Sequence, residues 1–384
     1  MGGSAASAPK AAKESYPKDN GSSKWLTIED GVLTKCDSEA EGVVIIPEGV
    51  TEIGEYAFEY CKKITEIVIP ASVTEIDSSS FEGDDDEKCT ALCAITVAGG
   101  NKKYKSADGV LYSDGGETLL LYPYGKKDEE FTVPDGVKTI DSFGANESLV
   151  SVKLPDSLEE IGDNAFCGCE ALESIKIPAS VTEIASSAFY NCEALCSITV
   201  ARGNEEYKSV DGVLYSDGGK TLFIYPEGKD DEEFTVPAGV KKIGVTAFSD
   251  CKALESITLP DGLKEIGESA FYECNALESI TLPASVTKIG DSALISCESL
   301  KQVRYEGTTD EWEEVEQGEG WLYETQVKKV RCSDGFGKLS KNAFGDDDED
   351  EDEEPDTNDS EDDEIDTNDS DDWDEEEEEG DEAD

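Results

Sequence analysis

Apolar residues recur along the chain with a period of 23 residues. The stretch that begins at Pro155 has apolar or small side chains at eight positions, and each position returns in the stretch that begins at Pro178. The first set is Leu158, Ile161, Ala165, Phe166, Cys169, Leu172, Ile175 and Ile177, and the second is Val181, Ile184, Ala188, Phe189, Cys192, Leu195, Ile198 and Val200. Self-similarity at this period predicts a solenoid, in which each coil contacts only its neighbours.

The spacing within one repeat predicts its local structure. Ile175 and Ile177 alternate with polar residues, which is typical of a short strand with one side inward. Pro178 ends this strand because proline cannot donate to a ladder. Ile184 then turns inward on the return path, and residues 183–191 are long enough for one helical or 3₁₀ turn only.

Eight repeats can be recognised, and two of them are irregular. The copy at Pro134 is two residues short and lacks the Ala-Phe-x-x-Cys segment around Phe143, so we expect a weaker, frayed coil there. The copy at Pro70 has five extra residues that include residues 84–86, which we expect to loop outward. The repeats begin at Pro47, Pro70, Pro134, Pro155, Pro178, Pro237, Pro260 and Pro283.

Two segments that match each other, about residues 98–133 and 201–236, interrupt the repeats. Both contain Asn-x-x-Tyr-x-Ser-x-Asp-Gly-Val-Leu-Tyr-Ser-Asp-Gly-Gly, which predicts a β-hairpin insertion with a glycine turn. Aromatic rings of this kind usually bury their apolar body, so we expect them to pack on the solenoid flank, with exposed partner anchors as the alternative. The tyrosines concerned are Tyr104, Tyr112, Tyr207 and Tyr215.

The two ends of the chain differ from its middle. Residues 1–24 are small and polar and are expected to form a disordered leader, and the solenoid is expected to cover residues 25–342. Large aromatics in about residues 306–335 predict a cap over the last coil. Residues 343–384 predict a disordered polyacidic tail, since residues 346–384 contain 28 acidic and no basic residues.

Charge and composition exclude several classes of function. The formal net charge is −59, which disfavours nucleic acid and anionic membranes as partners, and no apolar run is long enough to insert into a membrane. The sequence has no histidine, which removes Ser-His-Asp and Cys-His catalysis and histidine-ligated zinc. Catalysis by carboxylates or lysine stays open, but the sequence shows no set of nucleophile, base and orienting group. We therefore predict no catalytic residues, no metal and no cofactor.

Twelve cysteines could indicate disulfides or a metal site, but their spacing favours a packing role. Seven of them occupy one repeat position, as small buried fillers do, while disulfides and metal binding remain weaker alternatives. The seven are Cys61, Cys89, Cys169, Cys192, Cys251, Cys274 and Cys297.

The solvent side of the predicted strands is the candidate binding surface. Concave solenoid faces commonly bind partners, and one outward position of each strand forms a column along this face. The candidate partner-binding residues are Thr96, Lys153, Lys176, Thr199, Thr258, Thr281 and Arg304. Their short side chains also fit soluble strand exteriors with no binding role, since aromatic and arginine anchors are scarce in this column.

The unit Pro-x-x-Val-x-x-Ile-Gly-x-x-Ala-Phe-x-x-Cys-x-x-Leu-x-x-Ile-x-Leu resembles the BspA-like, or Treponema-pallidum-type, leucine-rich repeat. The hairpin segments and the closing Tyr-x-Gly-Thr…Trp…Cys-Ser-Asp-Gly stretch resemble the same family, so the likeness covers about residues 25–335. It implies a curved, right-handed leucine-rich-repeat solenoid, of α/β class by convention, built of short strands with 3₁₀ or one-turn helices. It also implies a protein-binding, often adhesin-like, surface protein without catalytic residues.

Two functions follow from these observations. The first is a non-enzymatic protein-interaction or adhesin-like scaffold that uses the concave strand face and the hairpin insertions. The alternative is a chaperone or buffer in which the acidic tail binds basic proteins or cations and the solenoid is the carrier. The N-terminal stretch shows no hydrophobic signal segment, which favours an intracellular location, whereas the resemblance implies the cell surface or secretion.

Overall fold

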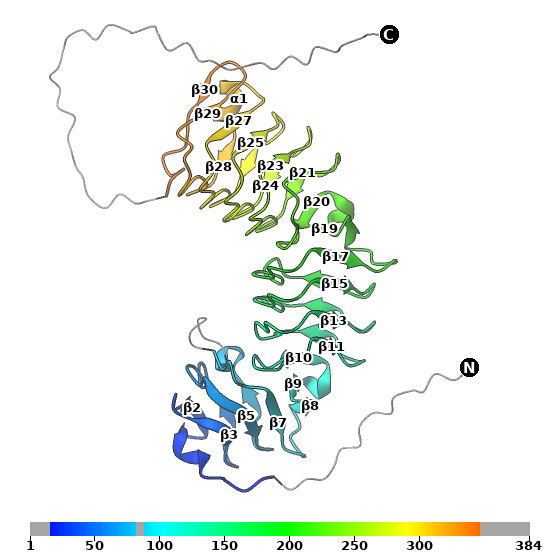
Figure 1. Ribbon diagram of the computed structural model, residues 1–384, viewed down its shortest axis with the longest axis vertical. Coiled ribbons are helices and arrows are strands. Elements are labelled where there is room, and N and C mark those ends of the chain that lie inside the picture. Colours follow the sequence, from blue (N-terminus) through cyan, green and yellow to red (C-terminus); the bar gives the residue numbers. More distant parts are fainter. Residues whose placement is uncertain (1–15, 82–87, 346–384) are drawn as a thin grey trace, which may run out of the picture. The chain divides into compact units, whose positions relative to one another are not determined.

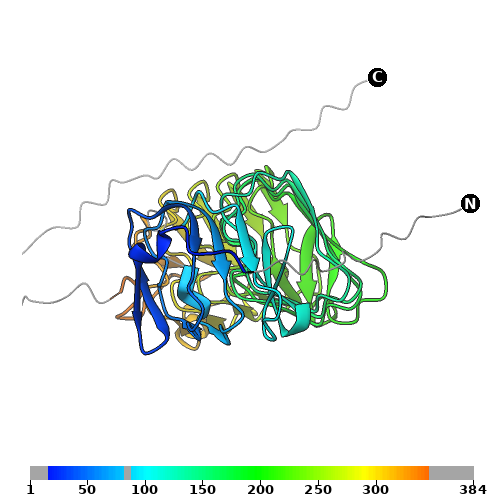
Figure 2. The ribbon, with the colours of Figure 1, turned by 90° about the horizontal axis from the view of Figure 1, so that it is seen from below.

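The computed structural model describes residues 16–81 and 88–345. All of these residues belong to one compact unit, Met1–Asp346. Short coils stack in chain order along this unit, as the predicted solenoid requires (Figures 1 and 2). The outward loop expected at residues 84–86, the leader up to residue 15 and the tail from residue 346 lie outside the described residues.

Each regular coil contributes two short strands that join two different parallel sheets. The strand β15 (Ser174–Ile177) pairs in register with the equivalent strand of the next coil, as predicted. After Pro178 the chain first forms β16 (Glu183–Ile184), a strand that was not predicted. The predicted single turn follows it: Ala188 N–H donates to Ala185 O at 3.1 Å and Tyr190 N–H donates to Ser187 O at 3.2 Å. A strand of two residues is too short to show a period of two, which is why the sequence pattern did not reveal it. A 3₁₀ turn does form in the Pro70 copy, at η2 (Ser78–Phe81).

The strands form three blocks, each with two sheets and its own apolar cluster. The N-terminal block has one sheet of β1 (Leu26–Glu29), β2 (Val32–Cys36), β4 (Glu52–Ile53) and β6 (Glu75–Ile76), and a second of β3 (Glu41–Ile45), β5 (Lys63–Ile69) and β7 (Ala94–Val97). The middle block has one sheet in the order β16, β14 (Glu160–Ile161), β12 (Thr139–Ile140), β10 (Thr118–Leu121), β9 (Val110–Ser113) and β8 (Lys105–Ala107), and a second of β11 (Glu130–Thr132), β13 (Ser151–Lys153), β15 and β17 (Ser197–Val200).

The C-terminal block repeats this plan and is the longest of the three. Its first sheet contains β18 (Lys208–Val210), β19 (Val213–Ser216), β20 (Thr221–Ile224), β22 (Lys242–Ile243), β24 (Glu265–Ile266), β26 (Lys288–Ile289) and β28 (Glu316–Gln317). Its second sheet contains β21 (Glu233–Thr235), β23 (Ser256–Thr258), β25 (Ser279–Leu282), β27 (Gln302–Tyr305), β29 (Val330–Arg331) and β30 (Phe336–Gly337). Short helical segments are η1 (Ser22–Trp25), η3 (Asp114–Gly116), η4 (Asp217–Gly219) and α1 (Thr309–Glu313).

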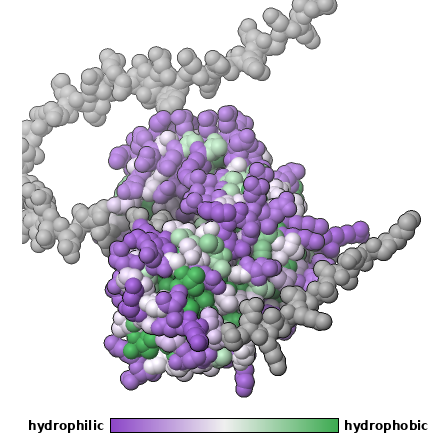
Figure 3. All heavy atoms as spheres, turned by 60° about the horizontal axis from the view of Figure 1, so that its bottom comes forward, coloured by the Kyte–Doolittle hydropathy of each residue, from purple (hydrophilic) through white to green (hydrophobic). Residues whose placement is uncertain are grey.

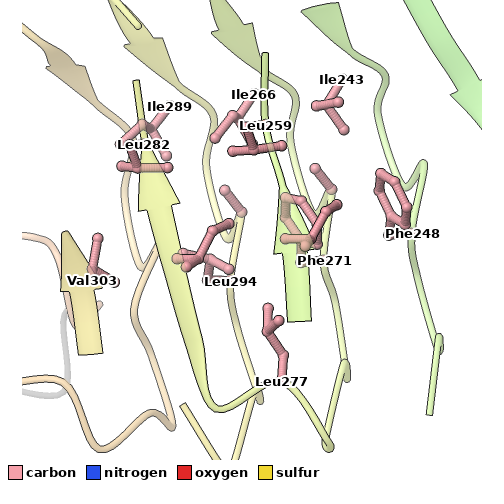
Figure 4. Packing of buried hydrophobic residues seen from close by; sticks show 14 of the residues in the cluster. Ile243, Phe248, Leu259, Ile266, Phe271, Leu277, Leu282, Ile289, Leu294 and Val303 are labelled. Carbon is pink, nitrogen blue, oxygen red and sulfur yellow. The ribbon is translucent and has the colours of Figure 1, made fainter. Parts of the chain in front are cut away.

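The interior repeats from coil to coil. Leu172, Leu195, Leu254 and Leu277 are all buried, and the phenylalanines of successive coils stack on one another. The rings of Phe248 and Phe271 lie 5.0 Å apart and nearly parallel, and Leu294 continues their row in the next coil (Figure 4). Because these contacts join neighbouring coils, each coil depends on the next for its core.

The glycine after the second-strand isoleucine allows the coils to approach closely. A Cβ atom on Gly267 would lie 2.7 Å from the backbone of Gly244, and one on Gly290 would lie 2.5 Å from the backbone of Glu268. Both distances are far below a normal carbon contact, so a side chain does not fit at these two coils. Elsewhere in the column Asp77, Asp141 and Ala185 take the place of the glycine, so the close approach is a property of the C-terminal block.

The two insertions form antiparallel hairpins, as predicted, and they also join the blocks. In the first, β8, β9 and β10 pair antiparallel, and the second repeats this pattern with β18, β19 and β20. The last strand of each meander then pairs in parallel with the following coil, β10 with β12 and β20 with β22. Each insertion therefore supplies a further coil of the solenoid.

Equivalent backbone hydrogen bonds fix both junctions. Ile95 N–H donates to Gly109 O at 2.8 Å, and Ile198 N–H donates to Gly212 O at 2.8 Å. Past the hairpins, Gly125 and Gly228 donate to the carbonyls of the leucines at residues 92 and 195, at 2.7 and 2.9 Å. The two junctions thus share one backbone plan.

The shortened copy at Pro134 is not frayed, contrary to the prediction. Phe143 is fully buried and its ring stacks 4.6 Å from that of Phe166. Asn146 occupies the column position that cysteine holds elsewhere, and it is also fully buried. Its side-chain amide donates to the carbonyls of Pro123, Tyr124 and Lys126 at 3.4, 3.2 and 2.9 Å. These bonds hold the coil in place of the missing segment.

Both ends of the described chain pack on the solenoid. Residues 16–24, which composition assigns to the leader, lie against β3: the Tyr16 hydroxyl donates to Ile46 O, and the Ser22 hydroxyl accepts from Ile45 N–H at 2.9 Å. At the other end Trp312 and Trp321 are buried over the last coils, as the predicted cap requires. Ala343, assigned to the tail, is buried in the same cluster.

Candidate functional site

The predicted binding column lies on one face of the parallel sheets. We define the strand face as the outward side of three sheets: the one that contains β7, the one with β11, β13, β15 and β17, and the one with β21, β23, β25, β27 and β29. Figure 1 shows these strands following one another along the solenoid. The seven predicted residues are all exposed, and their inward neighbours are buried because strand side chains alternate between faces. Register places Lys176 beside Thr199 and Thr281 beside Arg304.

The structure divides this column into three parts. Lys153, Lys176 and Thr199 belong to the middle block, and Thr258, Thr281 and Arg304 belong to the C-terminal block. Thr96 is separate, at the edge of the N-terminal block, where its hydroxyl donates to Glu66 Oε1 at 2.7 Å. The structure therefore brings six of the seven residues together in two groups of three, and the hairpin strands separate the groups.

In the N-terminal block the strand face is covered by the chain itself. Ile45 and Val68 are in register with Thr96 on the outward side, yet both are nearly fully buried. Tyr16 crosses this position, and its hydroxyl contacts the carbonyl oxygens of Ile46 and Val68. We call residues 16–24, which cover the strand face here, the strap. The strand face is open beyond this strap.

Three members of the column were missed by the sequence analysis. Thr132 pairs with Lys153, Thr235 pairs with Thr258, and Arg331 pairs with Arg304. The first two sit at the ends of the hairpin segments and the third sits in the cap, which were treated as outside the repeats. A signal was available for Arg331, since Val330-Arg331-Cys332 has the same alternation as Val303-Arg304-Tyr305.

The middle block carries a hollow on this face. It is lined by both lysines of the column together with Val152 and Leu154. Its other lining residues are Ser151, Asp156, Pro178 and Ala201. A groove with an apolar floor and ammonium groups at its rim can hold an extended peptide segment.

The second junction holds a group of buried acids away from the strand face. Asp250 is almost fully buried, and the side chain of Glu227 is 9% exposed. Burial raises the pKa of Glu227 to about 7, and the negative charge of Asp250 adds to this effect. Burial likewise raises the pKa of Asp250. Lys252 is the nearby cation, with its Nζ 3.9 Å from Glu227 Oε1 and 3.2 Å from Glu193 Oε1.

The cysteine column is buried, as predicted. All seven column cysteines are inaccessible, and burial raises the pKa of the Cys89 and Cys169 thiols to about 12, which keeps them protonated. Several donate to the phenylalanine carbonyl of the preceding coil, for example Cys192 to Phe166 O at 3.1 Å and Cys274 to Phe248 O at 3.0 Å. Their role in the structure is therefore packing between coils.

The insertion tyrosines pack on the solenoid, also as predicted. Tyr112 and Tyr215 are buried, while Tyr104 and Tyr207 are half-buried. The Tyr207 hydroxyl accepts from Ile184 N–H at 3.0 Å and so ties the hairpin to β16.

The face shown in Figure 3 is mostly hydrophilic. Figure 3 shows small apolar areas among polar ones near the N-terminal block, where Ile28 and Val43 are exposed aliphatic side chains. Within residues 16–81 and 88–345, no helix is both long and apolar enough to cross a bilayer. Across the same residues, no three cysteine or carboxylate side chains gather in a group that could hold a metal ion.

Comparison with known proteins supports the repeat assignment. The BspA type leucine-rich repeat region matches in six copies, over residues 22–105, 124–210 and 227–349. No curated protein matched the sequence.

Several solved structures are similar to this chain. A leucine-rich repeat protein from Eubacterium ventriosum ATCC 27560 is 32% identical, with 66% of this chain and 64% of that protein covered and a TM-score of 0.48. A leucine-rich cell surface protein from Faecalibacterium prausnitzii A2-165 is 27% identical, with 74% and 93% covered and a TM-score of 0.45. The pneumococcal vaccine antigen PcpA is 23% identical, with 83% and 88% covered and a TM-score of 0.53, a likeness of fold.

The chain thus spans just under two thirds of the Eubacterium protein's length. The repeat matches themselves extend over more than half of this sequence, and they coincide with the stacked coils described above. The protein belongs to the BspA-type leucine-rich repeat family.

Proposed function

We propose that the protein is a non-enzymatic scaffold that binds a partner protein through the strand face. The hairpin insertions set the spacing of the two open groups of column residues on this face. Leucine-rich repeats generally mediate protein interactions. A similar solved protein is a leucine-rich cell surface protein, which is consistent with an adhesin-like role for this chain.

One observation carries this proposal. Within each block, exposed residues of successive coils stand in register over a buried core, as Lys176 with Thr199 in the middle block and Thr281 with Arg304 in the C-terminal block show. Such a row is rigid before binding, so little conformational entropy is lost when a partner docks. Among the described residues we identify no nucleophile held by a base and an orienting group, which an enzyme of the usual kinds requires.

Lysine substitutions on the strand face test the proposal. The triple variant Thr199→Lys, Thr258→Lys and Thr281→Lys places bulk and charge in the column without touching the core. We expect it to lose partner proteins that the parent chain captures in a pull-down analysed by mass spectrometry. Capture that is unchanged in this variant would remove the strand face from the proposal.

The chain offers a matched control on its other sheet. Thr74, Thr182 and Thr287 are exposed threonines that precede the second strands, and each hydroxyl donates to a carbonyl one coil earlier. The same three changes to lysine there add equal charge and should leave capture intact. Deletion of residues 345–384 distinguishes the acidic-tail hypothesis from binding at the strand face. If the tail binds basic proteins, their salt-sensitive binding must be lost when the tail is deleted.

A further inference from the structure

The sequence has three arginines, and two of them are neighbours on the strand face. Arg304 of β27 and Arg331 of β29 are register partners on adjacent parallel strands. Val303 and Val330 next to them are fully buried, so both arginine side chains point outward. Adjacent strands lie about 4.8 Å apart, which brings the two guanidinium groups side by side.

These arginines do not take part in the internal ion pairs. In the part of the chain that the structure describes, the ion pairs use lysine, as in Lys242–Glu265 at 2.8 Å and Lys288–Glu316 at 2.6 Å. Arg304 donates from Nε to Gln302 Oε1 at 3.1 Å, a neutral partner. Like charges on neighbouring strands oppose folding. In a chain with 91 acidic residues, two adjacent arginines that have no carboxylate partner among residues 16–81 and 88–345 are therefore available to an external one.

A hollow lies between these arginines and the previous strand. Thr281 supplies a hydroxyl at its rim, and Ser333 supplies another, which donates to Gly307 O at 3.0 Å. The carboxylate of Glu306 also lines the hollow, so an incoming anion meets two guanidinium groups and one acid. Tyr305 and Cys332 complete the lining. The planar guanidinium group binds a carboxylate through two parallel hydrogen bonds, which lysine cannot do.

An exposed aromatic ring stands beside the arginine pair. Phe336 of β30 is in register with Arg331, and 58% of its surface is exposed. The Nζ of Lys329 lies 3.9 Å from the centre of its ring. Arginine and aromatic side chains supply most of the binding energy in protein interfaces, and this end of the strand face combines them.

We propose that Arg304, Arg331 and Phe336 form a binding site for an extended acidic segment of a partner protein, in which two carboxylates and an apolar residue occupy every second position. The two arginines hold the carboxylates, and Phe336 contacts the apolar side chain that follows them on the same side. This spacing suits an extended segment because every second side chain points to the same side and can meet the strand face. This inference rests on the proposed function and names the partner chemistry at one end of the strand face.

Peptide binding to the full chain tests the site. The probe is the fluorescent six-residue peptide Asp-Ser-Asp-Ser-Leu-Ser, compared by anisotropy with counterparts in which Asn or Lys replaces both Asp residues. We expect the Asp peptide to bind at least about tenfold more tightly than the Asn peptide, and added salt to weaken it. The double variant Arg304→Gln and Arg331→Gln should lose about tenfold or more in affinity. Arg202→Gln is the control, since Arg202 is exposed outside this site.

Phe336→Ser separates the aromatic contact from the charge. It should weaken the Asp peptide and leave the preference for Asp over Asn. Equal affinity for the Asp and Asn peptides, or full binding by the double arginine variant, would overturn the inference. Displacement of the peptide by inorganic phosphate at equal concentration would also overturn it, because the site would then be an anion site without peptide selectivity. If the Asp peptide fails to bind while the triple lysine variant still loses its partner proteins in the pull-down, this inference is wrong and the proposed function is kept.

Discussion

The two junctions between blocks have the same backbone and different chemistry. At the first, Tyr124 follows Pro123, a proline that both insertions share, and Asn146 fills the cysteine column. At the second, Glu227 holds the position of Tyr124 and Cys251 holds that of Asn146. The first junction is held by a neutral amide, whereas the second encloses two acids with raised pKa values.

This difference shows which features of a junction are required. The hairpin hydrogen bonds and the close glycine contact occur in both, so the backbone plan needs them. The Tyr122–Asp128–Lys126 set also recurs as Tyr225–Asp231–Lys229, with the hydroxyls donating to the carboxylates at 2.9 and 2.7 Å. Only the side chains that fill the gap between blocks differ, and they determine whether the junction responds to pH.

The largest effect is expected at the first junction. Asn146→Ala removes an amide that satisfies three backbone carbonyls in the interior, and we expect a loss of about 2–4 kcal/mol in the free energy of unfolding. Urea denaturation monitored by tryptophan fluorescence measures it. Cys251→Ala at the second junction, which removes only a small packed group, should cost about 1 kcal/mol. Equal losses at both sites would show that the amide bonds contribute nothing specific.

A shared effect is expected at the two junction glycines. A Cβ on Gly125 would lie 2.6 Å from the Ala91 backbone, and one on Gly228 would lie 2.5 Å from the Ala194 backbone. Gly125→Ala and Gly228→Ala should each destabilise the protein by about 1–3 kcal/mol through overpacking. Gly99→Ala, where a Cβ meets open space, should stay within about 0.5 kcal/mol of the parent in the same denaturation assay. If the glycine-to-alanine variant at one junction is as stable as the parent, the two blocks at that junction pack less closely than those at the other.

The smallest effect depends on pH and is confined to the second junction. The pKa of Glu227 is about 7 in the folded protein and 4.5 is its ordinary value, so the folded state binds the extra proton between these values. Stability must therefore fall as pH rises through this range, with the full penalty present above about pH 7. Glu227→Gln stays neutral and should be more stable than the parent by about 1–2 kcal/mol at pH 8.

The same variant also tests the direction of the pH effect at low pH. Below about pH 4.5 the parent carboxyl is protonated in both states, so the advantage of Glu227→Gln should disappear there. Tyr124→Phe at the first junction is the control and should show a difference from the parent that does not change between pH 4.5 and 8. A pH-independent gain for Glu227→Gln would mean that the amide stabilises through packing instead of charge.

The sequence predicted the features that follow from the 23-residue period, and it missed the two-residue strands and the contacts that occur once. The buried column from Leu172 to Leu277 and the outward residues such as Thr199 follow from periodicity, because every coil imposes the same environment. The second strands are too short for a period, and the role of Asn146 depends on carbonyls about twenty residues away. Arg331 and the strap at Tyr16 come from segments that pair with the repeats without matching their pattern. Which partner fills the strand face is not encoded in a period of 23 residues.

The junction contacts recur at an offset of 103 residues, as Ile95 with Gly109 and Ile198 with Gly212 show. Each copy of this unit carries its own hairpin, its own closing glycine and the coil that receives the next unit. A DNA segment that encodes one such unit could therefore be duplicated within the gene without disturbing the coils on either side. Recombination can thus change the length of the solenoid by whole units, while the two ends, which carry the strap and the arginine pair, are kept.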